Sequence, residues 1–291
     1  MKILDFNVHG KNLTLFGFGD LHRGSALSDT NHIIKDLEEA KKRNARIIGT
    51  GDIFDVIFYK DPRYAPNILN KKYAGTTNTM DLIIKDTADL LSPYAHLIDV
   101  LGDGNHEWQL AKRYSTNPTM RLIERINTKT GSHIKYGGYM YYVVYQFYPD
   151  RNPKQSKKGD LVIYVHHGLG GNSPVTKGMI DISRYREAGW QYDILFYAHK
   201  HYCIATRALF IKPIIGPKKN TLDVRNVRAV QTGTYKKNLT IENIDSEEIA
   251  QWEEKQGFGP SNIGGVFVKA KLRHKNSDTL RNWGFDIRAE I

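Results

Sequence analysis

The fold is indicated by a stretch near the start of the chain, Leu13-Thr14-Leu15-Phe16-Gly17-Phe18-Gly19-Asp20-Leu21-His22. Its first six residues are mostly apolar and lack helical spacing, which predicts a short buried strand. The strand is expected to stop at Gly19, and two polar side chains follow at once. The same pattern, an apolar strand followed by a small residue and polar side chains, recurs further along the chain. This repetition predicts an α/β protein.

Four later apolar stretches, at 46–50, 97–101, 161–165 and 193–197, also run into a small residue and polar side chains. Helices are predicted between the first three strands, from a cap at Asp29 or Thr30 to about Arg43, and from Thr79 to Leu91. In α/β sheets the loops at the carboxyl ends of strands meet at one edge. We therefore expect the five polar clusters to lie together in space.

The clusters contain the residue types that hold divalent transition metals. A site for two ions needs a bridging carboxylate and further ligands from converging loops. Asp20 and His22 lie two residues apart, so both can face one ion, and Asp52 is suited to bridge. Mixed nitrogen and oxygen ligands favour Mn, Fe, Zn, Co or Ni over Ca. The single cysteine, Cys203, excludes a thiolate zinc site within one chain.

Each of these residues also has a structural explanation when it is taken alone. His22 could be an ordinary loop histidine, Asp52 a turn or helix-cap residue, and Asn105 a residue of a left-handed turn. Those explanations do not account for a polar cluster after every predicted strand. The joint pattern therefore favours a metal centre.

The five clusters together resemble the calcineurin-like metallophosphoesterase superfamily. They occur in the order typical of that superfamily, over residues 19 to 201, and read Gly19-Asp20-Leu21-His22, Gly51-Asp52-Ile53-Phe54-Asp55, Gly104-Asn105-His106-Glu107, His166-His167-Gly168 and His199-Lys200-His201. The resemblance implies a four-layer α/β/β/α sandwich of two mixed sheets flanked by helices. It also implies two divalent metal ions, with Mn expected first and Fe, Zn, Ni, Co or Mg as alternatives.

The resemblance assigns a role to each cluster. One ion would be held by Asp20, His22, Asp52 and His201, and the other by Asp52, Asn105, His167 and His199. A hydroxide bridging the ions would attack phosphorus, and His106 would assist the leaving group or stabilise the transition state. Asp55 and Glu107 would orient ligands such as His22 or His106.

Three features depart from the usual pattern of the superfamily. Ala198 stands where glycine is usual, and the gap between Asp52 and Asn105 is long, which predicts an insertion at 59–78 near the site. The fourth cluster has two adjacent histidines. Because neighbours at a strand end point to opposite sides, only one can bind a metal. We favour His167, with His166 as the alternative.

The charge distribution favours an anionic substrate. The net charge is +11, and residues 112–158 carry ten Lys or Arg against two acids, while residues 200–237 carry nine against one. Such segregated charge favours nucleic acid, DNA or RNA, although a merely solvated basic surface is the alternative. The aromatic stretch from Tyr136 to Tyr148 could stack unpaired bases, or its side chains could pack inside the protein. A phosphatase, a small-molecule phosphodiesterase and a non-catalytic nucleic-acid-binding protein are the competing hypotheses.

Candidate substrate-binding residues lie beside the predicted ligands. They are Arg23 and Lys200, together with Gly170, Gly171 and Asn172 of a glycine-rich loop whose amides could surround a phosphate or which could be a plain loop. The sequence pattern of His167-Gly168 followed by this glycine-rich loop resembles that of metallophosphoesterases of bacteriophages and prophages. It is less similar to the pattern of the double-strand-break repair nucleases.

The chain is expected to form a catalytic core at 1–235 and a C-terminal extension at 236–291, in which strands are predicted at 266–272 and 283–287. The extension would close a sheet or cover the site. Neither a membrane-spanning run nor a signal peptide is expected from the sequence, which favours the cytoplasm of a bacterial cell or of a phage-infected host. The sequence leaves the oligomeric state open.

Overall fold

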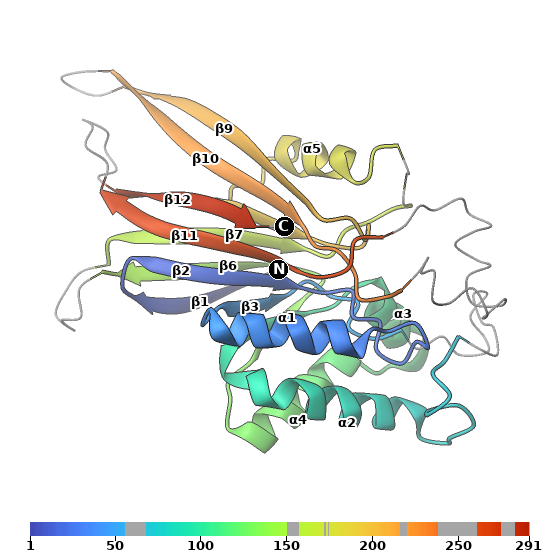
Figure 1. Ribbon diagram of the computed structural model, residues 1–291. Coiled ribbons are helices and arrows are strands. Elements are labelled where there is room, and N and C mark those ends of the chain that lie inside the picture. The colour runs from blue at the N-terminus through green and yellow to red at the C-terminus, as the bar shows by residue number, and fades with distance from the viewer. Residues whose placement is uncertain are drawn as a thin grey trace.

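Two six-stranded sheets pack face to face in the computed structural model of the chain (Figure 1). The structure describes residues 1–55, 68–149, 157–171, 173, 175–215, 220–237, 261–274 and 283–290. The first sheet has the order β1-β6-β7-β8-β10-β9, made of Lys2–His9, Met140–Tyr148, Gly159–His166, Ile194–Tyr197, Thr221–Gln231 and Ile204–Ile214. The second has the order β12-β11-β2-β3-β4-β5, made of Trp283–Glu290, Val266–His274, Asn12–Phe18, Arg46–Gly49, Ile98–Gly102 and Lys135–Gly138.

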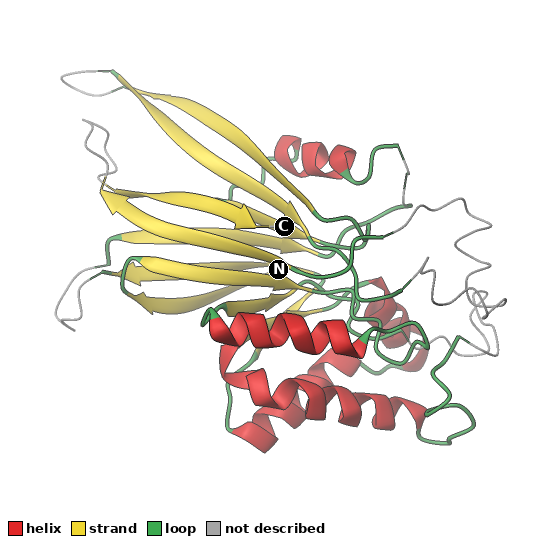
Figure 2. Cartoon of the chain, viewed as in Figure 1, coloured by secondary structure: helices red, strands yellow, loops and turns green. Residues whose placement is uncertain are grey.

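Helices cover the outer faces of both sheets. On the second sheet lie α1 (Thr30–Lys42), α2 (Thr79–Leu91) and α4 (Pro118–Thr130), and on the first lies α5 (Met179–Glu187) (Figures 1 and 2). A 3₁₀ helix, η1 (Ser92–Leu97), follows α2, and α3 (Asn105–Tyr114) begins close to the end of β4. Both sheets contain parallel and antiparallel pairs. The expected α/β/β/α sandwich of two mixed sheets is confirmed.

The first helix forms where its sequence predicts. Asp29 is its N-cap, and the side chain accepts a hydrogen bond from the backbone N–H of His32 at 3.1 Å. Ile33, Leu37 and Ala40 recur at helical spacing and are buried against the sheet. Local capping and periodicity are therefore sufficient to specify this element.

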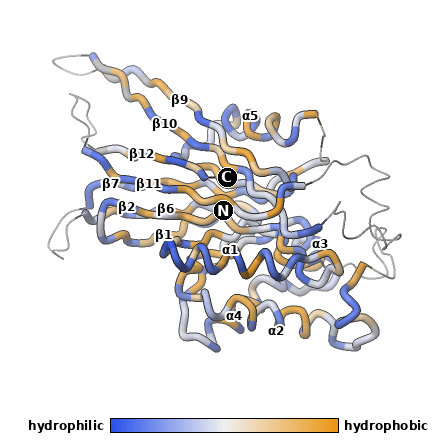
Figure 3. Tube along the Cα trace, viewed as in Figure 1, coloured by the Kyte–Doolittle hydropathy of each residue, from blue (hydrophilic) through white to orange (hydrophobic). Residues whose placement is uncertain are grey.

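The aromatic strand β6 buries every second side chain inside the protein. Tyr141, Tyr145 and Phe147 alternate toward the space between the sheets and are almost fully buried. The Tyr145 hydroxyl donates to Asp99 Oδ2 at 2.6 Å, and the Tyr141 hydroxyl donates to the Gly49 carbonyl at 2.5 Å. These bonds cross from one sheet to the other. The hydrophobic residues run along the strands of both sheets in Figure 3.

The C-terminal segment adds two strands to the second sheet. Strand β11 pairs antiparallel with β2, with Val266 opposite Gly17, and β12 pairs with β11 at the edge. The backbone N–H of Asn262 donates to the His201 carbonyl at 3.0 Å, so this segment also contacts a predicted metal ligand. Residues 238–260 lie outside the described residues.

Residues 68–78, the part of the expected insertion that the structure describes, pack beside the loop after β2. The Ala26 N–H donates to the Ile68 carbonyl at 3.0 Å, and the Asn70 N–H donates to the Gly24 carbonyl at 2.8 Å. Tyr73 is buried in the core beneath them. Residues 59–67 of the insertion lie outside the described residues.

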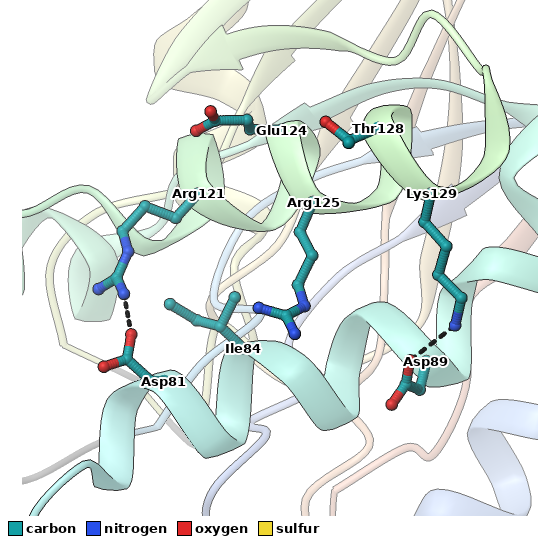
Figure 4. A pocket seen from close by; sticks show the side chains of 8 residues that line it. All are labelled: Asp81, Ile84, Asp89, Arg121, Glu124, Arg125, Thr128 and Lys129. Atoms are coloured by element: carbon teal, nitrogen blue, oxygen red, sulfur yellow. Dashed lines mark hydrogen bonds and ion pairs between the residues drawn. The ribbon is translucent and has the colours of Figure 1, made fainter.

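Helices α2 and α4 are joined by ion pairs across a shallow groove (Figure 4). Arg121 pairs with Asp81, and Lys129 Nζ lies 2.7 Å from Asp89 Oδ1. Arg125 projects between the two pairs in Figure 4. None of the predicted site residues lines this groove. Within the described residues, no helix has the length and apolarity to span a bilayer.

Candidate metal centre

The predicted metal ligands come together where strands of the two sheets end. Strands β2, β3 and β4 of the second sheet are parallel, as are β7 and β8 of the first. The loops that leave these strands gather at one end of the sandwich (Figure 2). Within the described residues, three groups of potential ligand atoms form there, each with its atoms within 4.8 Å of one another; two consist of predicted ligands, and the third joins His22 to Asp55 and His106.

The first group contains Asp20, His22 and His201. His201 Nε2 lies 3.2 Å from Asp20 Oδ1 and 3.3 Å from His22 Nε2. Asp20 Oδ1 is buried and accepts no hydrogen bond, whereas Oδ2 accepts one from the His199 N–H at 3.1 Å. A buried carboxylate oxygen without a donor, beside two imidazole nitrogens, fits a cation better than it fits a protein contact.

The second group contains Asp52, His167 and His199, with Asn105 beside them. His167 Nε2 lies 3.2 Å from Asp52 Oδ2 and 3.1 Å from Asn105 Oδ1. The other nitrogen, His167 Nδ1, lies 2.9 Å from the Thr50 carbonyl, which can only accept, so Nδ1 carries a proton. In the neutral ring Nε2 is therefore an acceptor that faces two more acceptors. This convergence of three lone pairs fits a divalent metal ion.

Backbone conformation singles out the same residues. Eight described residues other than glycine have a positive φ, and five of them are predicted ligands: Asp20, His22, Asp52, His199 and His201. Side chains disfavour this left-handed region, and residues held there cluster at functional sites. The loops are thus folded to aim these side chains inward despite the local cost.

Three charged side chains contact the predicted ligands, the backbone around them or one another. Asp55 lies 3.4 Å from His22 Nδ1 through Oδ2 and 3.0 Å from His106 Nδ1 through Oδ1. Lys236 Nζ lies 3.2 Å from the same Asp55 Oδ2. The Glu107 carboxylate accepts hydrogen bonds from three backbone N–H groups, those of Asp52 (3.0 Å), Phe54 (2.8 Å) and Gly104 (2.7 Å).

Gly104 allows the loop after β4 to approach Asp52. A Cβ atom at this position would lie 2.1 Å from Asp52 Oδ1, closer than any real contact. The same Oδ1 accepts the N–H of His106 at 3.0 Å. Close backbone approach at this glycine therefore brings the Asp52 and Asn105 clusters together.

The adjacent histidines after β7 point in different directions. His167 faces the second ligand group, as described above, whereas His166 Nδ1 lies 2.8 Å from the Tyr185 hydroxyl and accepts the Gly168 N–H at 2.9 Å. His166 therefore lies in a tyrosine-rich environment away from Asp52.

The two side chains that the sequence predicts to bind substrate are both buried. Arg23 is buried, and its guanidinium donates to the Thr30 hydroxyl at 2.6 Å. Lys200 is also buried, against backbone carbonyls of residues 169–171, so Gly170 and Gly171 turn carbonyls toward the protein. Asn172 lies outside the described residues.

Several contributors to the site gave no sequence signal. Thr50 acts through its backbone carbonyl, which any residue would provide. The Tyr235 N–H donates to the Asp20 carbonyl at 2.8 Å from a position 215 residues further along the chain. In the sequence, nothing distinguishes Lys236 from the other basic residues of the stretch 200–237. Contacts of this kind depend on tertiary structure, and local sequence does not encode them.

Electrostatics place protons where metal ions would bind. Burial alone lowers the pKa of His22, but the neighbouring carboxylates of Asp20 and Asp55 outweigh it and raise the pKa to about 10. Burial likewise opposes charge on His167, and Asp52 outweighs it and raises the pKa to about 9. Burial lowers the pKa of His199 to about 4, so this imidazole is neutral at pH 7.

Metal binding is therefore expected to release about two protons at pH 7.5, one each from His22 and His167. Isothermal titration calorimetry with Mn²⁺ in two buffers of different ionisation enthalpy measures this number. An observed enthalpy that is the same in both buffers would contradict the expectation.

Stability without metal should depend on pH through the same two histidines. Their pKa values rise from 6.5 to about 10 and about 9 on folding, so their contribution is complete below pH 6.5 and is lost as pH rises through 9 and 10. Burial opposes the charge on Asp20 and Asp52, but neighbouring histidines lower both pKa values, and their contribution is lost as pH falls below 3.8. Urea unfolding in EDTA at pH 6 and pH 10 would reveal the alkaline loss.

The fold and the two ligand groups define a metal-dependent phosphoester hydrolase. The family model of the calcineurin-like phosphoesterases matches residues 13–203, more than half of the chain and all five clusters, and the protein belongs to this family. A predicted phosphoesterase from Streptococcus pneumoniae aligns in structure with 10% identity over 95% of this chain and 98% of the other, at a TM-score of 0.32. A metallophosphoesterase from Sphaerobacter thermophilus aligns with 12% identity over 77% and 78%, at a TM-score of 0.31. No protein of curated function matches the sequence.

Proposed function

We propose that the protein is a dinuclear-metal phosphodiesterase that cleaves nucleic acid. The observation that carries the proposal is the pair of adjacent ligand groups at the ends of the parallel strands. In this proposal Asp20, His22 and His201 hold one ion, and Asn105, His167 and His199 hold the other. Asp52 would contribute its carboxylate to both sets of ligands. Mn²⁺ is the metal we would test first, since mixed nitrogen and oxygen ligands suit it.

Two bound divalent ions would acidify a water molecule and neutralise charge on the phosphoryl oxygens. The protein contributes the orientation of the groups around them. His106 Nδ1 lies 3.0 Å from Asp55 Oδ1, and His106 Nε2 lies on the side of the ligands, 3.9 Å from Asp52 Oδ2. His106 is then placed to give a proton to the leaving oxygen or to stabilise its charge.

Replacement of His106 by asparagine is expected to lower kcat about a hundredfold, because a positioned proton donor contributes at least this factor. Metal affinity should change little, since His106 belongs to neither proposed ligand set. Steady-state kinetics with bis-p-nitrophenyl phosphate and Mn²⁺ titration test the two parts separately. The expected loss should be smaller for a substrate with a better leaving group, and an equal loss for all esters would contradict the proton-donor role.

Helix α3 supports nucleic acid as the substrate. It begins at Asn105, in the second ligand group, and Trp108 lies one turn along with half of its surface exposed (50%). The Lys112 ammonium lies 5.2 Å from the centre of the Trp108 ring. An exposed indole next to a cation can stack on an unpaired base while the cation binds the phosphate backbone. The net charge of +11 agrees with an anionic polymer.

A substrate panel tests the proposal. Mn²⁺-loaded protein would be incubated with labelled single-stranded DNA, duplex DNA and RNA at two salt concentrations, and with a phosphomonoester. Cleavage of a polymer that weakens at high salt is expected. Brisk monoester turnover without polymer cleavage would instead identify a phosphatase. Polymer binding without any hydrolysis would identify a non-catalytic binding protein.

Removal of the exposed indole separates polymer binding from chemistry. Trp108→Ala is expected to raise KM for a single-stranded substrate about tenfold, because base stacking contributes roughly 1–3 kcal/mol. Turnover of bis-p-nitrophenyl phosphate, which has no base, should stay unchanged. Met120→Ala, which removes an exposed apolar side chain from α4, is the control. An unchanged KM for the polymer would remove α3 from the substrate path.

A further inference from the structure

Lys200 is buried between two predicted metal ligands. It follows His199 and precedes His201, and only 3% of its surface is exposed. Its ammonium donates to the carbonyls of Leu169 at 2.8 Å, Gly170 at 3.3 Å and Gly171 at 2.6 Å. It also lies 3.3 Å from Asp181 Oδ2, in the first turn of α5.

A buried ammonium is costly unless it is paired and its three donors are satisfied. Here one carboxylate and three carbonyls meet those needs. All three carbonyls belong to consecutive residues of one loop, so a single side chain fixes the conformation of that loop. The loop lies at the surface, since Leu169 is half exposed (46%) and Gly171 is exposed. At the start of the loop, the Tyr139 hydroxyl donates to the Gly168 carbonyl at 2.8 Å.

The loop in turn holds His199. The Gly170 carbonyl, one of the three that Lys200 contacts, lies 2.8 Å from His199 Nε2. A carbonyl can only accept, so Nε2 carries the proton, and Nδ1 is left with the lone pair that a metal needs. Partners that fix the tautomer and orientation of a metal-bound histidine strongly affect metal affinity.

We propose that Lys200, held by Asp181, is a positioning residue that fixes residues 169–171 so that the Gly170 carbonyl presents His199 Nδ1 to the second metal ion. The inference rests on the proposed function, because it requires a metal ion at the second ligand group. It departs from the sequence expectation that Lys200 contacts substrate.

The test compares metal binding by wild-type protein and Lys200→Met, a variant that keeps the length of the side chain but removes its donors. Calorimetric titration with Mn²⁺ should show two ions bound by wild type. In Lys200→Met the affinity for the second ion should fall about 10- to 100-fold, with the first ion unaffected. Electron paramagnetic resonance should then show an isolated Mn²⁺ where wild type shows a spin-coupled pair. KM for bis-p-nitrophenyl phosphate should change little at saturating metal.

Two further variants and a control complete the design. Lys200→Arg, which still donates several N–H groups, should retain a spin-coupled pair. Asp181→Asn, which leaves the ammonium in place, should weaken the second ion by at least about threefold and decides the question if Lys200→Met does not fold. Lys35→Met, on the exposed face of α1, should match wild type.

The outcomes distinguish this inference from the proposed function. If wild type, Lys200→Met and Asp181→Asn all bind two ions with equal affinity, the positioning role is overturned and the dinuclear centre stands. If wild type binds no second ion, both are overturned. A raised KM with full metal binding in Lys200→Met would show a substrate contact and would also overturn the positioning role.

Discussion

Asp52→Asn is expected to lower turnover of bis-p-nitrophenyl phosphate by at least about a thousandfold. Asp52 is buried, its Oδ2 lies 3.2 Å from His167 Nε2, and its Oδ1 accepts the His106 N–H. Asparagine keeps the shape but removes the charge that would hold two cations, and its amide N–H groups would point at metal sites. Metal analysis of the purified variant should show less than two ions per chain.

Matched variants separate this effect from general damage. His199→Ala should also abolish turnover but should retain one ion, because His199 belongs to only one ligand group. Asp5→Asn, an exposed aspartate on β1, should behave as wild type. Full turnover in both Asp52→Asn and His199→Ala would rule out the proposed two-metal centre.

Glu107→Ala is expected to destabilise the protein by about 3 kcal/mol or more. The substitution leaves the backbone N–H groups of Asp52, Phe54 and Gly104 buried without an acceptor, and each costs roughly 1–3 kcal/mol. Part of this cost is offset, because burial and the charges of Asp52 and Asp103 raise the pKa of Glu107 to about 8. Urea unfolding in EDTA measures the effect apart from metal binding.

Glu107→Gln serves as the comparison for this substitution. The amide retains one acceptor oxygen but places an NH₂ group against a backbone donor, so its loss should fall between wild type and alanine. Glu124→Ala, at an exposed position on α4, should change the free energy of unfolding by less than about 0.5 kcal/mol. A loss below about 1 kcal/mol in Glu107→Ala would show that the three N–H groups find other acceptors.

The elements around the site were predictable from sequence because their signals are local. An apolar run followed by glycine marks the ends of β2 and β3, and Asp29 with Ile33 and Leu37 marks α1. The same apolar runs also place the polar clusters at the carboxyl ends of the strands. The family resemblance then supplied the order of the clusters and the four-layer architecture.

Other elements escaped prediction because their signals are non-local. Strand β1 pairs with β6, nearly 140 residues away, and β9 and β10 form a long hairpin of mixed polarity. Helices α3, α4 and α5 were not predicted, although Asn117 caps α4 and Gly131 ends it in a left-handed conformation. Periodicity read without the tertiary context does not reveal which face a short helix buries.

Side-chain partners were the least predictable feature. A lysine between two histidines of a polar cluster is expected to be exposed. Lys200 is instead buried, because its ammonium donates to carbonyls of a loop about thirty residues earlier in the chain. Arg23 follows a predicted ligand and reads as substrate-binding, yet it packs onto the start of α1. Burial of a charge depends on acceptors that the fold brings in, and those acceptors here are backbone carbonyls and hydroxyls.

The left-handed backbone at the metal centre has an evolutionary consequence. Each L-residue in that conformation costs on the order of 1 kcal/mol relative to glycine, so the five together offset a substantial share of the roughly 5–15 kcal/mol that stabilises a typical domain. Glycine at Asp20, His22, Asp52, His199 or His201 would relax the backbone and remove a ligand at once. Selection for thermostability alone would therefore drive these positions toward glycine and yield durable but inactive descendants.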